Sequence, residues 1–257
     1  MSQPFSIVSA ITAGMYARDA YGETPLGSMN VEWITGTQNV DVTVLVIHEA
    51  DRVTFAFEGT HDVRGWFRDG SILFHRYTLP DGTVIGIHSG FYGTVDNVFN
   101  RIVEIARAAI AAGKKVFVTG HSKGAGECLI LAGRLFWECA ITVQPVYCFG
   151  CPRVFDQAAQ VAFEKIGLTV WRVVNANDVV CRLPSLFGYH HVGQVAFFDS
   201  EGELSENPKL FFRAASDFFG AVWGLVHRKN VLVYDHGASL YIIDMLNWQA
   251  RYQADAA

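Results

Sequence analysis

The chain has 257 residues, of which 51% are hydrophobic, 13% aromatic and 18% charged, with a formal net charge of -5. This composition excludes intrinsic disorder, collagen-like repeats and coiled coils, and the lack of a dense basic run argues against binding to nucleic acid. Length and apolar content predict a single domain over residues 1–257 with a large core. No transmembrane helix is predicted, because charges, Gly or Pro interrupt every apolar run before about 18 residues.

The predicted elements alternate between helices and strands. Residues 1–17 lack the basic start of a signal peptide and predict an amphipathic helix, which leaves a cytoplasmic or a mature secreted protein as expectations. Strand patterns over 42–48 and 53–57 predict a hairpin. The elements expected after it are helices over 91–112, 123–139 and 154–166, and strands over 115–119, 143–149 and 168–174. This order predicts an α/β fold with a mostly parallel central sheet and helices on both faces.

A G-x-S-x-G motif lies between a predicted strand and a predicted helix. Its sequence is Thr119-Gly-His-Ser-Lys-Gly124, and this strand–turn–helix setting is typical of a nucleophile elbow. The tight turn strains the central residue, and the two glycines avoid clashes with the neighbouring turn. Ser122 is therefore the candidate nucleophile, and the start of the following helix offers backbone N–H groups to a developing negative charge.

The base and the acid are sought after the serine, because α/β-hydrolases place them in the order serine, acid, histidine. Four histidines follow it at a distance, at positions 190, 191, 227 and 236. His236 is favoured, because it lies in a loop between an apolar stretch and a predicted C-terminal helix. Asp178 is favoured as the acid because it directly follows the strand over 168–174, and Asp156 and Asp199 are the alternatives.

Six ordered blocks, spread over about residues 42–245, resemble the class 3 (fungal-type, triacylglycerol) lipases of the α/β-hydrolase fold. The blocks begin at Phe57-Glu-Gly-Thr60, His88-Ser-Gly-Phe91, Val118, Phe149-Gly-Cys-Pro-Arg-Val154, Asn177 and Asp235. Carried over by motif, the resemblance implies Ser122 as nucleophile, Asp178 as acid and His236 as base. It also implies oxyanion-hole donors at Thr60, through its backbone N–H and its hydroxyl, and at the backbone N–H of Lys123.

The chain departs from the family pattern in two ways. Lys123 stands where the family commonly has Leu, and a cation beside the site would bias the preference for acyl or head groups. Cys151 and Cys181 stand where Gln and Pro are usual. Because both follow neighbouring strands at one end of the sheet, a disulfide between them is a hypothesis, with two separate buried thiols as the alternative.

Two aromatic segments flank the expected site. Residues 61–74 follow the oxyanion threonine, where the family carries a lid, and Trp66 and Phe67 are candidate substrate contacts, unless they only pack the loop against the sheet. Residues 210–226 have helical apolar spacing and predict either core or one wall of an acyl-binding cleft. His121 is expected to point away from the serine hydroxyl and is a third candidate contact with substrate.

The sequence predicts a serine carboxylic-ester hydrolase, foremost a lipase that acts on acylglycerols through an acyl-serine intermediate. A feruloyl-type or other carboxylesterase, a phospholipase A1 and an acyltransferase remain alternatives, because fold and triad do not fix the substrate. An inactive lipid-binding relative is the alternative outside enzymes. No metal or organic cofactor is expected, the expected partner is an ester or lipid at a lipid–water interface, and the oligomeric state is open.

Overall fold

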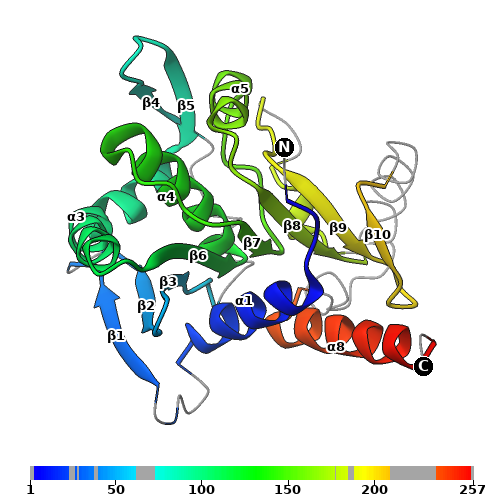
Figure 1. Cartoon of the computed structure of the whole chain (residues 1–257). Coiled ribbons are helices and arrows are strands. Elements are labelled where there is room, and N and C mark those ends of the chain that lie inside the picture. Colours follow the sequence, from blue (N-terminus) through cyan, green and yellow to red (C-terminus); the bar gives the residue numbers. More distant parts are fainter. Residues whose placement is uncertain are drawn as a thin grey trace.

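The central feature of the fold is an eight-stranded sheet in the order β1-β2-β3-β6-β7-β8-β9-β10 (Figure 1). The computed structural model describes residues 3–22, 27, 29–37, 40–61, 73–176, 178–184, 188–208 and 236–255. The strands of this sheet are β1 (Asn30–Thr35), β2 (Thr43–His48), β3 (Arg52–Phe57), β6 (Lys115–His121), β7 (Val146–Phe149), β8 (Val170–Asn175), β9 (Gln194–Phe198) and β10 (Leu204–Glu206). Strands β3, β6, β7, β8 and β9 pair in parallel, whereas the pairs at the two edges of the sheet are antiparallel.

Helices cover both faces of the sheet, as predicted (Figure 1). The described helices are α1 (Ile7–Asp19), α3 (Ser89–Ala111), α4 (Lys123–Cys139), α5 (Gln157–Ile166), the 3₁₀ turn η1 (Val180–Arg182) and α8 (Ala238–Asp255). In Figure 1, α3, α4 and α5 lie on one side, and α1 and α8 lie together on the other. Among these described helices, none combines the length and apolar character needed to cross a bilayer.

The period-2 geometry of the strands divides the core between the two faces. On β2, Val44 and Val46 join the cluster that includes Ile102 of α3 and Leu129 of α4. Leu45 and Ile47 point the other way. The central strands are thus buried on both faces, which is why they read as continuous apolar runs in the sequence.

Most predicted elements are present with small shifts of their ends. The hairpin is β2–β3, and α4 covers the predicted residues 123–139. Strand β7 begins at Val146 rather than at residue 143, because Pro145 has no N–H to donate to the ladder. Helix α5 begins at Gln157, where the Asp156 carboxylate accepts the N–H of Ala159 and caps the helix.

Several strands at the sheet edges and a second hairpin were not predicted. The hairpin pairs β4 (Phe74–Thr78) with β5 (Val84–His88) in a separate two-stranded sheet. Strands β1 and β4 are mostly exposed or half-buried, with Ile34 of β1 as their one buried position, so they carry little of the apolar periodicity that reveals central strands.

Candidate active site

The turn between β6 and α4 holds Ser122 in a backbone conformation that L-amino acids rarely adopt, with φ at 58° and ψ at -124°. The turn is so tight that a Cβ added to Gly120 would lie 2.3 Å from the carbonyl oxygen of Gly124. A Cβ on Gly124 would lie 2.4 Å from the carbonyl oxygen of Phe57 on the neighbouring strand β3. Both glycines of the motif are therefore required by space. Such a strained turn is found at nucleophiles that must project from the end of a strand.

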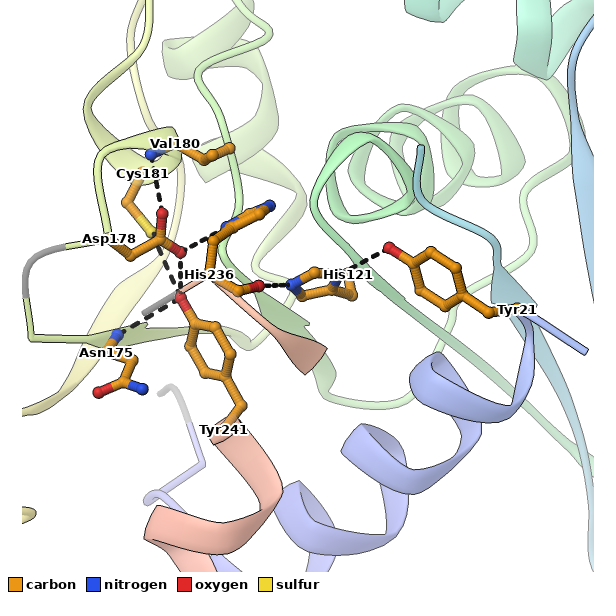
Figure 2. A network of polar contacts seen from close by, with 8 residues as sticks. All are labelled: Tyr21, His121, Asn175, Asp178, Val180, Cys181, His236 and Tyr241. Carbon is orange, nitrogen blue, oxygen red and sulfur yellow. Dashed lines mark hydrogen bonds and ion pairs between the residues drawn. The ribbon is translucent and has the colours of Figure 1, made fainter. Parts of the chain in front are cut away.

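The structure brings Asp178 and His236 together, although they are 58 residues apart in the sequence. Asp178 follows β8, and His236 comes two residues before α8. His236 donates its Nδ1–H to Oδ2 of Asp178 over 2.7 Å (Figure 2). Both side chains are buried, with 0% of Asp178 and 2% of His236 exposed. Parallel strands end at one edge of the sheet, so the loops after β6 and β8 can meet there.

Three groups donate hydrogen bonds that keep Asp178 ionised. Besides His236, the backbone N–H of Val180 donates to Oδ1 over 2.8 Å, and the hydroxyl of Tyr241 donates to Oδ2. Burial raises the pKa of the carboxyl, but the charge of His236 and these hydrogen bonds outweigh it, so the pKa of Asp178 lies below its ordinary value. An ionised Asp178 holds the proton of His236 on Nδ1 and leaves the lone pair on Nε2.

The two atoms that would exchange a proton are Oγ of Ser122 and Nε2 of His236. Both are buried, and neither has a hydrogen-bond partner among the described residues. All other polar atoms of the His236 and Asp178 side chains are engaged by their neighbours. Catalytic hydrogen bonds often form only when substrate is bound, so this arrangement is compatible with a hydrogen bond from Ser122 to His236 that forms in the substrate complex.

His121 extends this polar network behind the base. Its Nε2 lies 2.6 Å from the carbonyl oxygen of His236, so Nε2 must donate and Nδ1 must accept, here from the hydroxyl of Tyr21 at 2.8 Å (Figure 2). Burial, with the nearby charge of His236, lowers the pKa of His121 to about 3 and keeps it neutral. The side chains joined by these hydrogen bonds are called the acid–base cluster below: Asp178, His236, Tyr241, His121 and Tyr21. Both ring nitrogens of His121 are thus engaged within the protein, one of them on the carbonyl oxygen of His236, and a contact of His121 with substrate stays a prediction.

Two residues of this site escaped the sequence reasoning. Tyr241 was assigned no role from the sequence, and its position on the first turn of α8 beside Asp178 is a result of the tertiary structure. Gly150 directly follows β7, and a Cβ there would lie 2.7 Å from Cε1 of His236 and 2.9 Å from Oδ2 of Asp178. A glycine at the end of a parallel strand is a signal that could have located Gly150.

The family is given by comparison with known proteins. The model of the family described as lipase (class 3) matches residues 54–188, more than half of the chain. The chain belongs to the class 3 lipase family.

Fungal relatives of this family are similar over different shares of their length. A lipase of Rhizomucor miehei is 28% identical over 168 residues, which cover 63% of this chain and 46% of that protein. A secreted mono- and diacylglycerol lipase of Malassezia globosa is 28% identical over 209 residues, covering 73% of this chain and 68% of that protein. The chain thus spans somewhat under half of the length of the Rhizomucor relative.

Solved structures of class 3 lipases share the fold. The triacylglyceride lipase of Rhizomucor miehei matches with a TM-score of 0.66 at 21% identity, over 80% of this chain and 85% of that one. Lipase II of Rhizopus niveus matches with a TM-score of 0.67 at 22% identity, over 76% and 83%. This likeness confirms the predicted α/β-hydrolase fold.

The expected oxyanion segment of the class 3 lipases lies against the elbow. A Cβ on Gly59 would lie 2.8 Å from the carbonyl oxygen of His121, so the backbone before Thr60 packs directly on the strand end that carries the serine. Lys123 is the first residue of α4, where backbone N–H groups have no partner within the helix. The two donors implied for Thr60 and Lys123 thus come from neighbouring segments.

The side chain of Lys123 does not project into solvent beside the site. Its Nζ donates to the carbonyl oxygen of Asp41 over 2.7 Å and lies 3.2 Å from Oε1 of Glu127, and only 8% of the side chain is exposed. The cation is therefore buried and paired within the protein. This placement corrects the hypothesis that the cation biases the choice of acyl or head group.

The second departure from the family pattern also has a structural answer. All five cysteines are free thiols, so the hypothesised disulfide between Cys151 and Cys181 is wrong. Sγ of Cys151 is directed to the carbonyl oxygen of Pro152. Sγ of Cys181 lies 3.6 Å from Oδ2 of Asp178 and adds a weak donor to that carboxylate.

The predicted aromatic walls fall mostly outside the described residues. Trp66 and Phe67 lie in the undescribed range 62–72, and the apolar segment 210–226 lies in the range 209–235. The described end of the expected lid is held in place, because the Leu73 carbonyl oxygen accepts the N–H of Ser89 and the ring of Phe74 packs on Tyr189 at 4.2 Å. The lid and the acyl-cleft wall stay predictions.

Proposed function

We propose that this chain is a serine carboxylic-ester hydrolase that cleaves acylglycerols through an acyl-serine intermediate. The observation that carries the proposal is the buried Asp178–His236 pair, which leaves Nε2 of His236 without a described partner in a chain whose strained elbow presents Ser122. The order serine, acid, histidine along the chain agrees with this assignment.

Acylation begins when Nε2 of His236 takes the proton of the Ser122 hydroxyl and the oxygen attacks the carbonyl carbon of the ester. The carbonyl oxygen becomes an oxyanion, which the backbone N–H groups of Thr60 and Lys123 stabilise. The ester C–O bond then breaks as His236 returns its proton to the leaving alcohol.

Deacylation repeats these steps with water in place of the serine hydroxyl. His236 removes a proton from water, the hydroxide attacks the acyl carbon, and the proton passes to Oγ of Ser122 as the fatty acid leaves. In both halves the ionised Asp178 stabilises the imidazolium that forms on His236. The ring centres of His121 and His236 are 4.5 Å apart. Because His121 is neutral, it does not repel the imidazolium that forms on His236.

An acylglycerol is proposed as the substrate because of the family and the names of its members. The relatives from Malassezia globosa and Penicillium camembertii are described as secreted mono- and diacylglycerol lipases. These names concern those proteins, and their extension to this chain is part of the proposal. A lipid–water interface is the matching place of action.

The first experiment asks whether Ser122 is an active nucleophile. We expect a fluorophosphonate probe to label the wild type at Ser122 and the protein to hydrolyse p-nitrophenyl esters, whereas Ser122→Ala abolishes both and keeps the same unfolding temperature. Hydrolysis retained by Ser122→Ala would refute the assignment.

The second experiment addresses the substrate. Release of fatty acid is measured from mono-, di- and triacylglycerols of increasing acyl length, each below and above the concentration at which an emulsion forms. A lipase is expected to prefer long acyl chains and to gain rate with the emulsion. A preference for soluble short-chain esters in all conditions would assign a carboxylesterase instead.

A further inference from the structure

A second polar cluster lies at the start of α4 and takes no part in the proton transfers described above. Lys123 and Glu127 are four residues apart on this helix and pair over 3.2 Å between Nζ and Oε1. The side chains are 8% and 0% exposed. Lys123, Glu127, Thr94 and Asp41 are called the charge cluster below. A fully buried glutamate on a helix that packs into the core is rare enough to call for a reason.

The charge cluster joins three segments of the fold. Nζ of Lys123 donates to the carbonyl oxygen of Asp41, two residues before β2, over 2.7 Å. Oγ1 of Thr94 on α3 lies 2.6 Å from Oε1 of Glu127. Oε2 of Glu127 is buried and has no hydrogen-bond partner among the described residues. The pair therefore ties the first turn of α4 to the start of β2 and to α3.

Stability alone does not account for such a pair. Removing two charges from water costs free energy that their attraction often fails to recover, and apolar residues of similar size commonly serve a fold as well. Most class 3 lipases are expected to have Leu directly after the nucleophile, where this chain has the cation.

The location of the pair connects it with the oxyanion hole. The backbone N–H of Lys123 is one proposed donor, and the other belongs to Thr60, three residues after β3. Strand β3 is paired with β2, and the N–H of Glu58 donates to the carbonyl oxygen of Thr43 over 3.0 Å. The bond from Lys123 to Asp41 thus ends next to β2, and β2 pairs with β3, the strand that leads into the segment of Thr60.

We propose that Lys123 and Glu127 are a positioning pair, whose side chains fix the first turn of α4 relative to β2 and so set the spacing of the two oxyanion-hole donors. This inference rests on the proposed function. Glu127 directs the Nζ of Lys123 toward Asp41, and the bond to Asp41 holds the Lys123 backbone in register. Neither side chain touches the reacting atoms.

The geometry also makes the pair sensitive to pH. Burial raises the pKa of Glu127 to about 7, against the lowering effect of Lys123 and Thr94, while the nearby charge of Asp41 raises it further. Oγ1 of Thr94 is 2.8 Å from the carbonyl oxygen of Phe91, so its hydroxyl can turn to that oxygen when Glu127 carries a proton. Protonated Glu127 no longer offers a negative charge to Lys123.

The test is a double-mutant cycle with a matched control on the same helix. Lys123→Met, Glu127→Gln and the double variant remove the pair but keep the backbone N–H of residue 123. The control cycle uses Arg134→Met and Glu138→Gln. Arg134 is buried and Glu138 is half-buried, and they form another ion pair four residues apart on α4. For each protein we would measure kcat, KM, the rate of fluorophosphonate labelling and the unfolding temperature.

We expect each single variant of the positioning pair to lower kcat and the labelling rate about 10-fold to 100-fold with little change in KM, since misplaced oxyanion donors act on the transition state. The double variant is expected to lose no more than the worse single variant, because both remove one interaction. The control cycle is expected to lower the unfolding temperature and to leave kcat unchanged.

A pH series separates positioning from a structural role. The ratio of wild-type kcat to that of Glu127→Gln is expected to be largest above pH 7 and to shrink below it, because wild-type Glu127 then becomes neutral like glutamine. Thr94→Val keeps both charges but removes one hydrogen bond to the Glu127 carboxylate, a bond that lowers the pKa of that group. In this variant kcat is therefore expected to begin falling toward that of Glu127→Gln at a higher pH than in the wild type. This milder variant keeps the test open if Lys123→Met does not fold.

The outcomes distinguish the two proposals. Wild type that neither labels nor hydrolyses esters would overturn the proposed function, and the positioning role with it. An active wild type whose pair variants keep their kcat at every pH, while unfolding at lower temperature as the control variants do, would overturn the positioning role alone.

Discussion

The residues on either side of Ser122 point into two different buried polar clusters. His121 belongs to the acid–base cluster, where the Asp178 carboxylate receives hydrogen bonds from His236, Tyr241 and the backbone of Val180. Lys123 belongs to the charge cluster, where one oxygen of Glu127 has no described partner. Both carboxylates are fully buried, so burial by itself does not decide their charge.

The number of donors explains the difference. The pKa of Asp178 is lowered despite burial, because three hydrogen bonds and the charge of His236 favour its ionised form. The pKa of Glu127 is raised to about 7, because burial outweighs Lys123 and Thr94. The carboxyl of Asp178 therefore stays ionised near neutral pH, whereas the carboxyl of Glu127 changes charge there.

The largest expected effect comes from neutralising the acid. Asp178→Asn would let His236 adopt the wrong tautomer, and we expect kcat to fall about 10⁴-fold with the fold intact. Ester hydrolysis and circular dichroism would check this. Asp156→Asn is the control, because Asp156 caps α5 and pairs with Arg76 away from the site. An equal loss of activity in both variants would contradict the assignment of the acid.

Removing one donor from the acid–base cluster should have a smaller effect. Tyr241→Phe deletes the hydroxyl that donates to Asp178, and we expect kcat to fall about 10-fold. The lowered pKa of Asp178 contributes stability that is lost as pH falls through the folded-state value, so the variant should unfold at a higher pH on acidification. Tyr252→Phe, on an exposed part of the same helix, is expected to change neither property.

The charge cluster should make the protein less stable as pH rises. The ordinary pKa of 4.5 applies to Glu127 in the unfolded chain and about 7 in the folded chain, so between these values the folded state binds more protons and stability falls with rising pH. The titration of Glu127 should make the free energy of unfolding of the wild type larger at pH 5 than at pH 8 by on the order of 1–3 kcal/mol. This difference should be absent in Glu127→Gln.

Urea unfolding at the two pH values measures that difference. Glu138→Gln, on the same helix but with a quarter of its side chain exposed, is the control and should keep the wild-type dependence. An identical pH dependence in wild type and Glu127→Gln would show that Glu127 does not titrate in this range.

The smallest expected effect concerns the five cysteines, none of which forms a disulfide. Because all five cysteines are free, a reducing agent should change neither the activity nor the unfolding temperature. A thiol reagent should react readily with the half-buried Cys139 in the native protein and with all five thiols after unfolding without reductant. Fewer than five reactive thiols would mean that a disulfide exists.

Apolar periodicity was sufficient to predict the central part of the fold. Strands β2, β3 and β6 and helices α3 and α4 bury a face or both faces, so their sequences follow periods of 2.0 or 3.6 residues. The edge strand β1 is held by backbone pairing with β2, and β4 and β5 are held by pairing with each other. The side chains of β1 and β4 are mostly exposed or half-buried, so these sequences lack the apolar periodicity that predicts a strand.

The sequence by itself predicted the α/β fold, the elbow at Ser122, and Asp178 and His236 as the candidate acid and base, because chain order and strand ends restrict where these groups occur. Only the tertiary structure decided where side chains found their partners. It turned His121 to His236, buried Lys123 against Glu127 and Asp41, and left Cys151 and Cys181 as free thiols. These outcomes depend on distances between segments far apart in the chain, and no local pattern of residues encodes such distances.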